Sequence, residues 1–414
     1  MKNKIFKAID DNRQAIFDCG EYILNNPELG YKEFKTAKRV QEEFEKLGIP
    51  YKADLAITGV KGTVGKKDAK INICIIGELD AVKCFEHPFA NKETGAAHAC
   101  GHNAQIASMI GAAYGIVKSG VLDEIDGKIT FFAVPAEEFI ELEYRGQLVK
   151  DGKIKHMAGK QELIEIGAFD DIDMAMMIHS HALTPDLNVY LDGTSLGFDT
   201  KEIVFEGKAA HGSEPFNGVN ALNAATLALM GINANRETFR DEDRIRIHPI
   251  VTNGGDVVNV IPDRCVIETY VRGANSEAIK DACQKVDNAV NAGAMAVGAK
   301  CTIKNTTGYK PLIQDKNLSA VFKENALMFT QQENIYHGVN MTGSTDMGDI
   351  SAIMPAIQPT MGGFTGALHG KDFAIADKEA VYITASKILA CTAYDLLKDG
   401  AKKAIEIKEA FKKQ

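Results

Sequence analysis

The sequence has no run of basic residues long enough to form the positive surface of a nucleic-acid-binding protein. Its 47 lysines and arginines are outnumbered by 56 aspartates and glutamates, which gives a net charge of −9 at pH 7. An acidic chain without a basic patch is poorly suited to a polyanion. We therefore expect no nucleic acid as a partner.

Long apolar segments are also missing. Residues 1–10 contain no uninterrupted apolar core of the kind found in signal peptides, and no segment has the length and apolar character of a membrane span. We therefore expect a cytoplasmic protein that has no membrane as a partner.

The eight cysteines lack the dense spacing of a disulfide framework, so most of them are expected to be reduced core residues. Cys100 is the exception because of its neighbours. In His98-Ala99-Cys100-Gly101-His102 a thiol and an imidazole lie two residues apart, and the carboxylate pair Glu137-Glu138 follows later in the chain. Zinc-type metals take N, S and O ligands of this kind. The pattern predicts a metal site.

The neighbouring strands indicate where this site lies. Ile71–Gly77 is a β-branched run that ends shortly before Asp80, and Lys128–Val134 ends at Pro135, just before the two glutamates. Active sites of open α/β sheets form at such strand ends. Asp80 and the glutamate pair are therefore expected at the same edge of the sheet.

Two further elements bring candidate ligands. Ala104–Val117 has helical spacing, so the Cys-Gly-His turn should lie at a helix N-terminus, which favours a thiolate. Ile172–Ile178 is predicted to be another buried strand and ends at His179-Ser180-His181. Either histidine of this tripeptide can be the ligand.

The order of predicted elements indicates two domains, for which 414 residues are sufficient. From about Ser195 the order is β-α-β-β-α-β, the ferredoxin-like unit. We predict an α/β fold with a large catalytic domain, residues 1–194 and 310–414, whose mixed central sheet is flanked by helices. A smaller ferredoxin-like α+β domain, residues 195–309, is inserted into it and can close as a lid.

The motifs resemble those of the aminoacylase and carboxypeptidase-type family of dinuclear metallopeptidases, in its amidohydrolase branch. The resemblance follows the family's order over nearly the whole chain. Asn103 and Gly343–Asp349 are most similar to the B subunits of p-aminobenzoyl-glutamate hydrolases and to related dipeptidases. The matching pieces are Glu78–Ala81, His98–Asn103, Pro135–Glu138, Met177–His179, Ala210-His211, Asn259–Asp263, Gly343–Asp349 and Leu368-His369.

The resemblance implies two divalent metal ions about 3.5 to 4 Å apart, with the Cys100 thiolate as the bridge. Zinc is expected from the ligand types, with manganese or cobalt as alternatives. The resemblance favours His179 over His181, which would then lie behind the ligands or in the substrate pocket. The implied ligands are Cys100, His102, Glu138, His179 and His369.

The remaining site residues are expected to act beside the metals. Glu137 is expected to take a proton from water and to return it to the departing amine; the alternative is a second carboxylate ligand. The resemblance implies that His211 stabilises the oxyanion; in dimeric relatives this histidine comes from the neighbouring subunit. It also implies that Asn259 and Arg272 bind the carboxylate or carbonyl of the substrate. We expect Asp80 to orient a ligand.

Residues Phe139–Gly167 are longer than the short Gly-rich link of most relatives. They are interpreted as a surface insertion of mixed charge, or alternatively as a segment that lines the substrate pocket with Glu141, Glu143 or Arg145.

The expected function is metal-dependent hydrolysis of an amide bond in a small molecule, either a dipeptide or an N-acyl amino acid such as a p-aminobenzoyl-glutamate-like compound. A homodimer through the inserted domain is implied by resemblance. Two alternatives remain: a non-catalytic or obligate partner subunit of a hetero-oligomeric amidohydrolase, and a thiol hydrolase with Cys100 as nucleophile and His102 as base.

Overall fold

The structure, a computed structural model, describes residues 1–413 and consists of two compact units. The larger unit comprises residues 1–193, 313–340 and those from 349 on; the smaller comprises Thr194–Leu312 and Met341–Gly348. Residues 341–348 thus group with the smaller unit, although they were predicted to belong to the large domain. The backbone amides of Met341 and Leu196 make this connection by donating to the carbonyls of Thr194 and Gly343.

The larger unit is built on a mixed six-stranded sheet in the order β1-β2-β6-β3-β7-β15, which confirms the predicted sheet type. The strands β6, β3, β7 and β15 run parallel, and β1 and β2 are antiparallel to their neighbours. The strands are β1 (Tyr51–Leu55), β2 (Gly59–Gly65), β3 (Asn72–Glu78), β6 (Lys128–Val134), β7 (Met174–Met176) and β15 (Ala356–Ile357).

A second, four-stranded sheet in the order β14-β9-β16-β8 lies in the same unit. Its strands are short, and β8 contains His179. They are β8 (His179–Ser180), β9 (Val189–Leu191), β14 (Ile335–His337) and β16 (Thr360–Met361).

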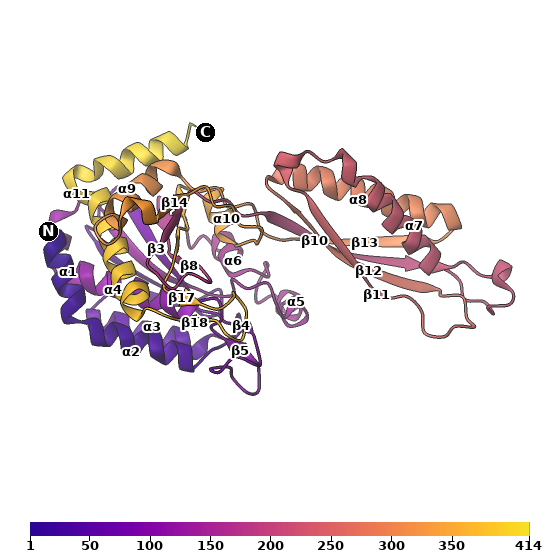
Figure 1. Ribbon diagram of the computed structural model, residues 1–414, viewed down its shortest axis with the longest axis horizontal. Helices are drawn as coiled ribbons and strands as arrows, with labels where there is room; N and C mark the ends of the chain where they lie inside the picture. The colour runs from indigo at the N-terminus through magenta and orange to yellow at the C-terminus, as the bar shows by residue number, and fades with distance from the viewer. Residues whose placement is uncertain (414) are drawn as a thin grey trace. The chain divides into compact units, whose positions relative to one another are not determined.

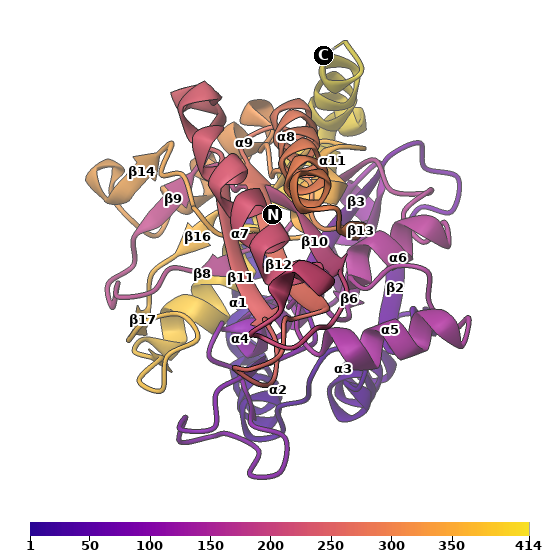
Figure 2. The same ribbon diagram turned by 90° about the vertical axis from the view of Figure 1, so that its right-hand side faces the viewer.

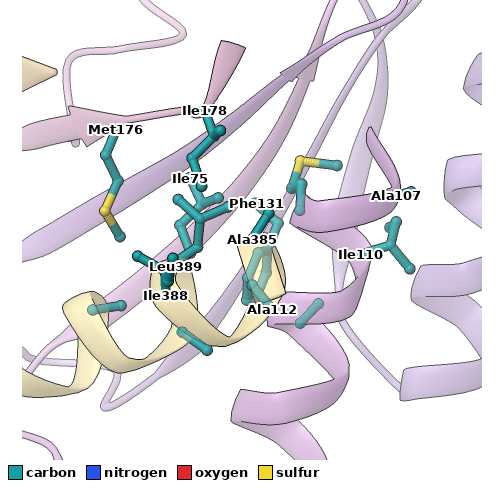
Figure 3. Packing of buried hydrophobic residues seen from close by; sticks show 14 of the residues in the cluster. Ile75, Ala107, Ile110, Ala112, Phe131, Met176, Ile178, Ala385, Ile388 and Leu389 are labelled. Atoms are coloured by element: carbon teal, nitrogen blue, oxygen red, sulfur yellow. The ribbon is translucent and has the colours of Figure 1, made fainter. Parts of the chain in front are cut away.

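Helices pack on the central sheet and bury its apolar side chains. Ile75 and Phe131 of the sheet lie beside Ala385 and Leu389 of α11 in the core (Figure 3). Burial of such side chains is the main stabilising term of a domain this large. Figure 1 shows α1 and α2, coloured indigo, beside α4. The helices are α1 (Lys2–Asp11), α2 (Arg13–Asn25), α3 (Phe34–Leu47), α4 (His102–Lys118), α9 (Lys316–Ala326) and α11 (Ala385–Phe411).

One helical segment of the described chain, Glu379–Phe411, is long and apolar enough to cross a membrane by length and mean hydropathy alone. No such segment was expected from the sequence. In the structure 83% of its apolar window is buried within the protein. Non-helical residues Lys398–Ala401 also break it. Its apolar character is therefore explained by core packing.

The smaller unit has the predicted ferredoxin-like order, with an antiparallel sheet β11-β12-β10-β13. Two helices, α7 and α8, cover one face of this sheet (Figure 1 and Figure 2). The elements are β10 (Gly197–Glu206), α7 (Ala221–Ala234), β11 (Arg246–Asn253), β12 (Arg264–Gly273), α8 (Ser276–Val297) and β13 (Lys300–Thr307).

Candidate metal centre

The central parallel strands bring two acidic segments to one edge of the sheet. Glu78 of β3 pairs with Val134 of β6, so the two strands end level with each other. Beyond this point the backbone amide of Glu138 donates to Asp80 Oδ2 at 2.9 Å. The predicted convergence of Asp80 and the glutamate pair is therefore present.

The turn at Ala136 explains how two adjacent glutamates both stay at the site. Ala136 has a φ of 53°, in the left-handed region, which interrupts the alternation of the strand. Its N–H donates to Glu33 Oε1 at 2.8 Å, and its carbonyl accepts from Arg145 Nη1 at 3.4 Å. Glu33 and Arg145 are both fully buried. These two side chains hold the peptide that precedes Glu137.

Glu33 should make stability depend on pH. Burial, helped by the charge of Asp80, raises the pKa of Glu33 from 4.5 to about 7. Between these values the unfolded chain loses its proton while the folded protein keeps it, so stability falls as pH rises from 4.5 to 7, by about 3 kcal/mol. We expect Glu33→Gln to remove most of this fall, as measured by urea titrations across the interval. The exposed variant Glu93→Gln should keep the parental pH dependence; an equal fall in Glu33→Gln would contradict the assignment.

The Cys-Gly-His turn lies at the N-terminus of α4, as predicted. Gly101 has a φ of 81°, and a Cβ there would lie 2.9 Å from Ser180 Cβ, so this position requires glycine. Burial raises the pKa of the Cys100 thiol, but the charge of His179 and hydrogen bonds from His102, His179 and His369 hold the pKa well below its usual value. The geometry thus favours a thiolate.

The candidate ligands form two trios that share Cys100 Sγ. One contains Cys100, His102 and His179, and the other contains Cys100, Glu138 and His369; within each trio the ligand atoms lie within 4.8 Å of one another. Cys100 Sγ is 3.5 Å from His179 Nε2, and His369 Nε2 is 3.2 Å from Glu138 Oε1. Two ions that share a thiolate would fit this arrangement.

The orientation of the ligands supports this fit. His102 Nδ1 lies 2.8 Å from the carbonyl oxygen of Asp80, and His179 Nδ1 lies 2.9 Å from that of Ser180. A carbonyl accepts a hydrogen bond, so each Nδ1 carries the proton and each Nε2 is available to a metal. Among the described residues, the only polar groups next to the buried atoms His102 Nε2 and Glu138 Oε1 are the other candidate ligands and Glu78. Buried polar atoms that face only one another in this way indicate that a metal ion binds between them.

The two histidines of the 179–181 tripeptide have different surroundings. His181 Nδ1 contacts Thr360 Oγ1 at 2.8 Å, and its ring stacks on Tyr190 with centroids 3.6 Å apart. His179 is the one that faces Cys100. His369, which follows a Gly-rich loop, has a φ of 61° and donates its N–H to the carbonyl of Ala99.

The other predicted residues lie in the smaller unit. The N–H of Gly212, next to His211, donates to the carbonyl of Asn259 at 2.6 Å. Arg272 Nη1 donates to Ser344 Oγ at 2.7 Å, and its guanidinium lies over Phe198. Within that unit His211 and Asn259 are thus neighbours. Their catalytic roles stay predictions.

The interpretation of Phe139–Gly167 as a surface insertion holds only in part, because exposed residues such as Glu143 and Lys150 alternate with buried ones. The segment contains α5 (Leu142–Lys150) and α6 (Gly159–Glu165), and the charged side chains of Arg145 and Lys160 are fully buried. Arg145 binds backbone carbonyls, so it does not line a pocket. Glu141 forms ion pairs with Lys32 and Lys83, and Glu143 is exposed.

Three buried residues near the ligands were missed in the sequence: Glu78, Gln105 and Lys160. Lys160 Nζ lies 2.6 Å from Glu78 Oε1, and Gln105 Nε2 donates to Glu78 Oε2 at 2.9 Å. A third trio with ligand atoms within 4.8 Å comprises Glu78, His102 and Glu137. The position of Glu78, two residues before Asp80 at the end of a buried strand, could have indicated it. No signal in the sequence indicates that Lys160 is buried.

Comparison with known proteins places this arrangement in a family. Residues 195–297 match the peptidase dimerisation domain of M20 peptidases. The chain is 30% identical to thermostable carboxypeptidase 2 of Saccharolobus solfataricus over 73% of this chain and 74% of that protein. It is 26% identical to Xaa-Arg dipeptidase of Mus musculus over 96% and 89% of the two chains.

A solved structure is also similar. The Bacillus subtilis YXEP protein, described as a dinuclear metal binding peptidase from the M20 family, superposes with a TM-score of 0.73 at 24% identity over 94% of this chain and 99% of that one. The fold is therefore shared, and the resemblance seen in the motifs is confirmed. This chain belongs to the M20 peptidase family and is a metal-dependent hydrolase.

Proposed function

We propose that this protein hydrolyses the amide bond of dipeptides or N-acyl amino acids that carry a free carboxylate. The observation that carries this proposal is the pair of ligand trios around Cys100 Sγ. The dipeptidase and carboxypeptidase names of the two relatives support the substrate class. The proposed ligands of two divalent ions are Cys100, His102, Glu138, His179 and His369.

Different residues of this chain would perform the proton transfers and orient the metal ligands. Bound metal ions would polarise the scissile carbonyl and make water more acidic. Glu137, buried at the edge of the sheet, takes a proton from the attacking water and returns it to the amine nitrogen as the C–N bond breaks. Asp80 orients His102 through its carbonyl and Glu138 through its carboxylate.

Residues of the smaller unit are proposed to bind the substrate. The Arg272 guanidinium is half-buried over the rings of Phe198 and Tyr270, which restricts its orientation. A restrained guanidinium suits a carboxylate, because both can pair through two parallel hydrogen bonds. His211 is proposed to stabilise the oxyanion and Asn259 the substrate carbonyl.

The test is hydrolysis of a panel of dipeptides, N-acyl amino acids and p-aminobenzoyl-glutamate by metal-stripped and metal-restored protein. Cleavage that depends on added zinc, manganese or cobalt and that fails when the free carboxylate is amidated would support the proposal. Turnover that survives complete metal removal would favour Cys100 as a thiol nucleophile. No turnover with two ions bound would favour a missing partner subunit.

Metal binding should strengthen with pH. Hydrogen bonds to Cys100 and Glu138 raise the pKa of His369 to about 10 in the metal-free protein, so this imidazole is protonated at pH 7. A metal must displace that proton, so affinity should rise by about tenfold per pH unit between pH 7 and 9 for this one proton. Chelator competition across this range measures the slope. A flat profile would show that His369 is not a ligand.

We also propose a homodimer through the smaller unit. Strand β11 is an edge strand, and Ile250 and Val251 on it are 51% and 43% exposed. Met230 of α7 is 64% exposed. Exposed apolar side chains beside an unpaired strand edge favour association. We expect Ile250→Lys to reduce the particle mass from twice 44.9 kDa to one chain in light scattering, and the exposed control Lys280→Glu to leave it unchanged. A dimeric Ile250→Lys variant would exclude this edge.

A further inference from the structure

A buried ion pair lies directly behind the proposed metal ligands. Lys160 of α6 and Glu78 of β3 are both fully buried, with Nζ and Oε1 2.6 Å apart. Gln105 holds Glu78 twice: its Nε2 donates to Glu78 Oε2 at 2.9 Å, and its Oε1 accepts from the Glu78 N–H at 3.1 Å. The carboxylate is thus fixed from two sides by groups that are not metal ligands.

The Oε2 atom of this carboxylate also faces His102. Glu78 Oε2 lies 3.1 Å from His102 Nε2, the ring atom that is available to a metal. Glu78, His102 and Glu137 also form a trio whose ligand atoms lie within 4.8 Å of one another. His102 Nε2 has a single lone pair, so it can serve either this oxygen-rich trio or the Cys100 trio, but not both.

We propose that Lys160 is a positioning residue that keeps the Glu78 carboxylate out of metal coordination, so that His102 serves the ion shared with Cys100. This inference rests on the proposed metal centre. The Lys160 ammonium neutralises the carboxylate charge through Oε1, and Gln105 donates to Oε2, so neither oxygen can bind a metal without weakening an existing interaction. Without the ammonium, Glu78 would keep only the neutral Gln105 as a partner, and its uncompensated negative charge beside His102 Nε2 would make it an additional oxygen ligand.

The position of Glu78 would determine whether an oxygen ligand is added to the sulfur and nitrogen ligands of this ion. With Glu78 excluded, an ion held by Cys100, His102 and His179 would have only sulfur and nitrogen ligands from the protein. With Glu78 included, the set is harder and the coordination number is higher, which favours manganese over zinc. Lys160 would thereby act on metal choice without touching a metal.

The test uses the full-length protein loaded with cobalt, because thiolate charge-transfer absorption reports Cys100 ligation and visible d–d intensity reports coordination number. In Lys160→Met we expect the d–d intensity to fall by about threefold as an oxygen ligand is added. The affinity for manganese relative to zinc should rise by about tenfold. The double variant Glu78→Gln/Lys160→Met lacks the carboxylate anion and should regain the parental spectrum.

The matched control is Lys155→Met, which removes an exposed lysine of the same segment that pairs with Glu165. It should retain the parental spectrum. A parental spectrum in folded Lys160→Met, or no recovery in the double variant, would overturn the inference. If Lys160→Met does not fold, Glu78→Gln alone decides: an unchanged spectrum supports exclusion of Glu78, and a changed one shows that Glu78 is already a ligand. Absence of thiolate charge transfer in the parent would instead refute the proposed metal centre.

Discussion

Replacement of Glu137 with glutamine is expected to lower kcat by about 10³-fold while both metal ions remain bound. The amide keeps the shape of the carboxylate but cannot accept a proton from water. Glu137 is not a member of the two trios that share Cys100, so metal content should stay at the parental level. Steady-state kinetics together with elemental analysis of the purified variant measure both quantities.

The matched control for this variant is Glu143→Gln, a change at an exposed glutamate of α5. It should leave kcat within about twofold of the parent, since surface substitutions have small effects. Two results would contradict the role of Glu137. Near-parental turnover would show that another group moves the proton, and loss of a metal ion would make Glu137 a ligand.

Replacement of Cys100 with alanine is expected to abolish activity, by about 10⁴-fold or more, because both ligand trios contain this residue. Metal content should fall below two ions per chain. Cys84→Ala, at a half-buried cysteine outside the trios, should retain both ions and activity. A Cys100→Ala variant that still binds two ions would refute the bridging role.

The same thiolate should make the metal-free protein sensitive to peroxide. A low thiol pKa increases the thiolate fraction, and thiolates are the form that peroxide oxidises. Pre-loading with metal should slow inactivation, which is followed as activity recovered after peroxide is removed and metal is restored. Equal inactivation rates with and without metal would count against metal ligation by Cys100.

Much of the site could be predicted from local sequence. The strands before Asp80 and Glu137 are apolar runs with clear ends, and the Cys-Gly-His turn begins an apolar helix. Signals of this kind depend on neighbours in the chain, so they can be read without a structure. The choice between His179 and His181 could not be read this way, because it depends on Tyr190 and Thr360 from other elements.

The buried cations were missed for a related physical reason. Lysine and arginine are almost always exposed, so Arg145 and Lys160 are assigned to the surface unless a partner is known. Their partners, the Ala136 carbonyl and the Glu78 carboxylate, lie 9 and 82 positions away in the chain. Only the tertiary structure brings Lys160 against the end of β3. The segment that was interpreted as a surface insertion of mixed charge therefore contacts both acidic strand ends.

The division of the chain affects how new members of the family can arise. The smaller unit consists of two segments, Thr194–Leu312 and Met341–Gly348, and the second supplies Ser344 to Arg272. A single recombination event that transfers only the long segment between two relatives would separate Arg272 from its own partner. Exchange of the intact smaller unit between relatives therefore requires both segments to be transferred together.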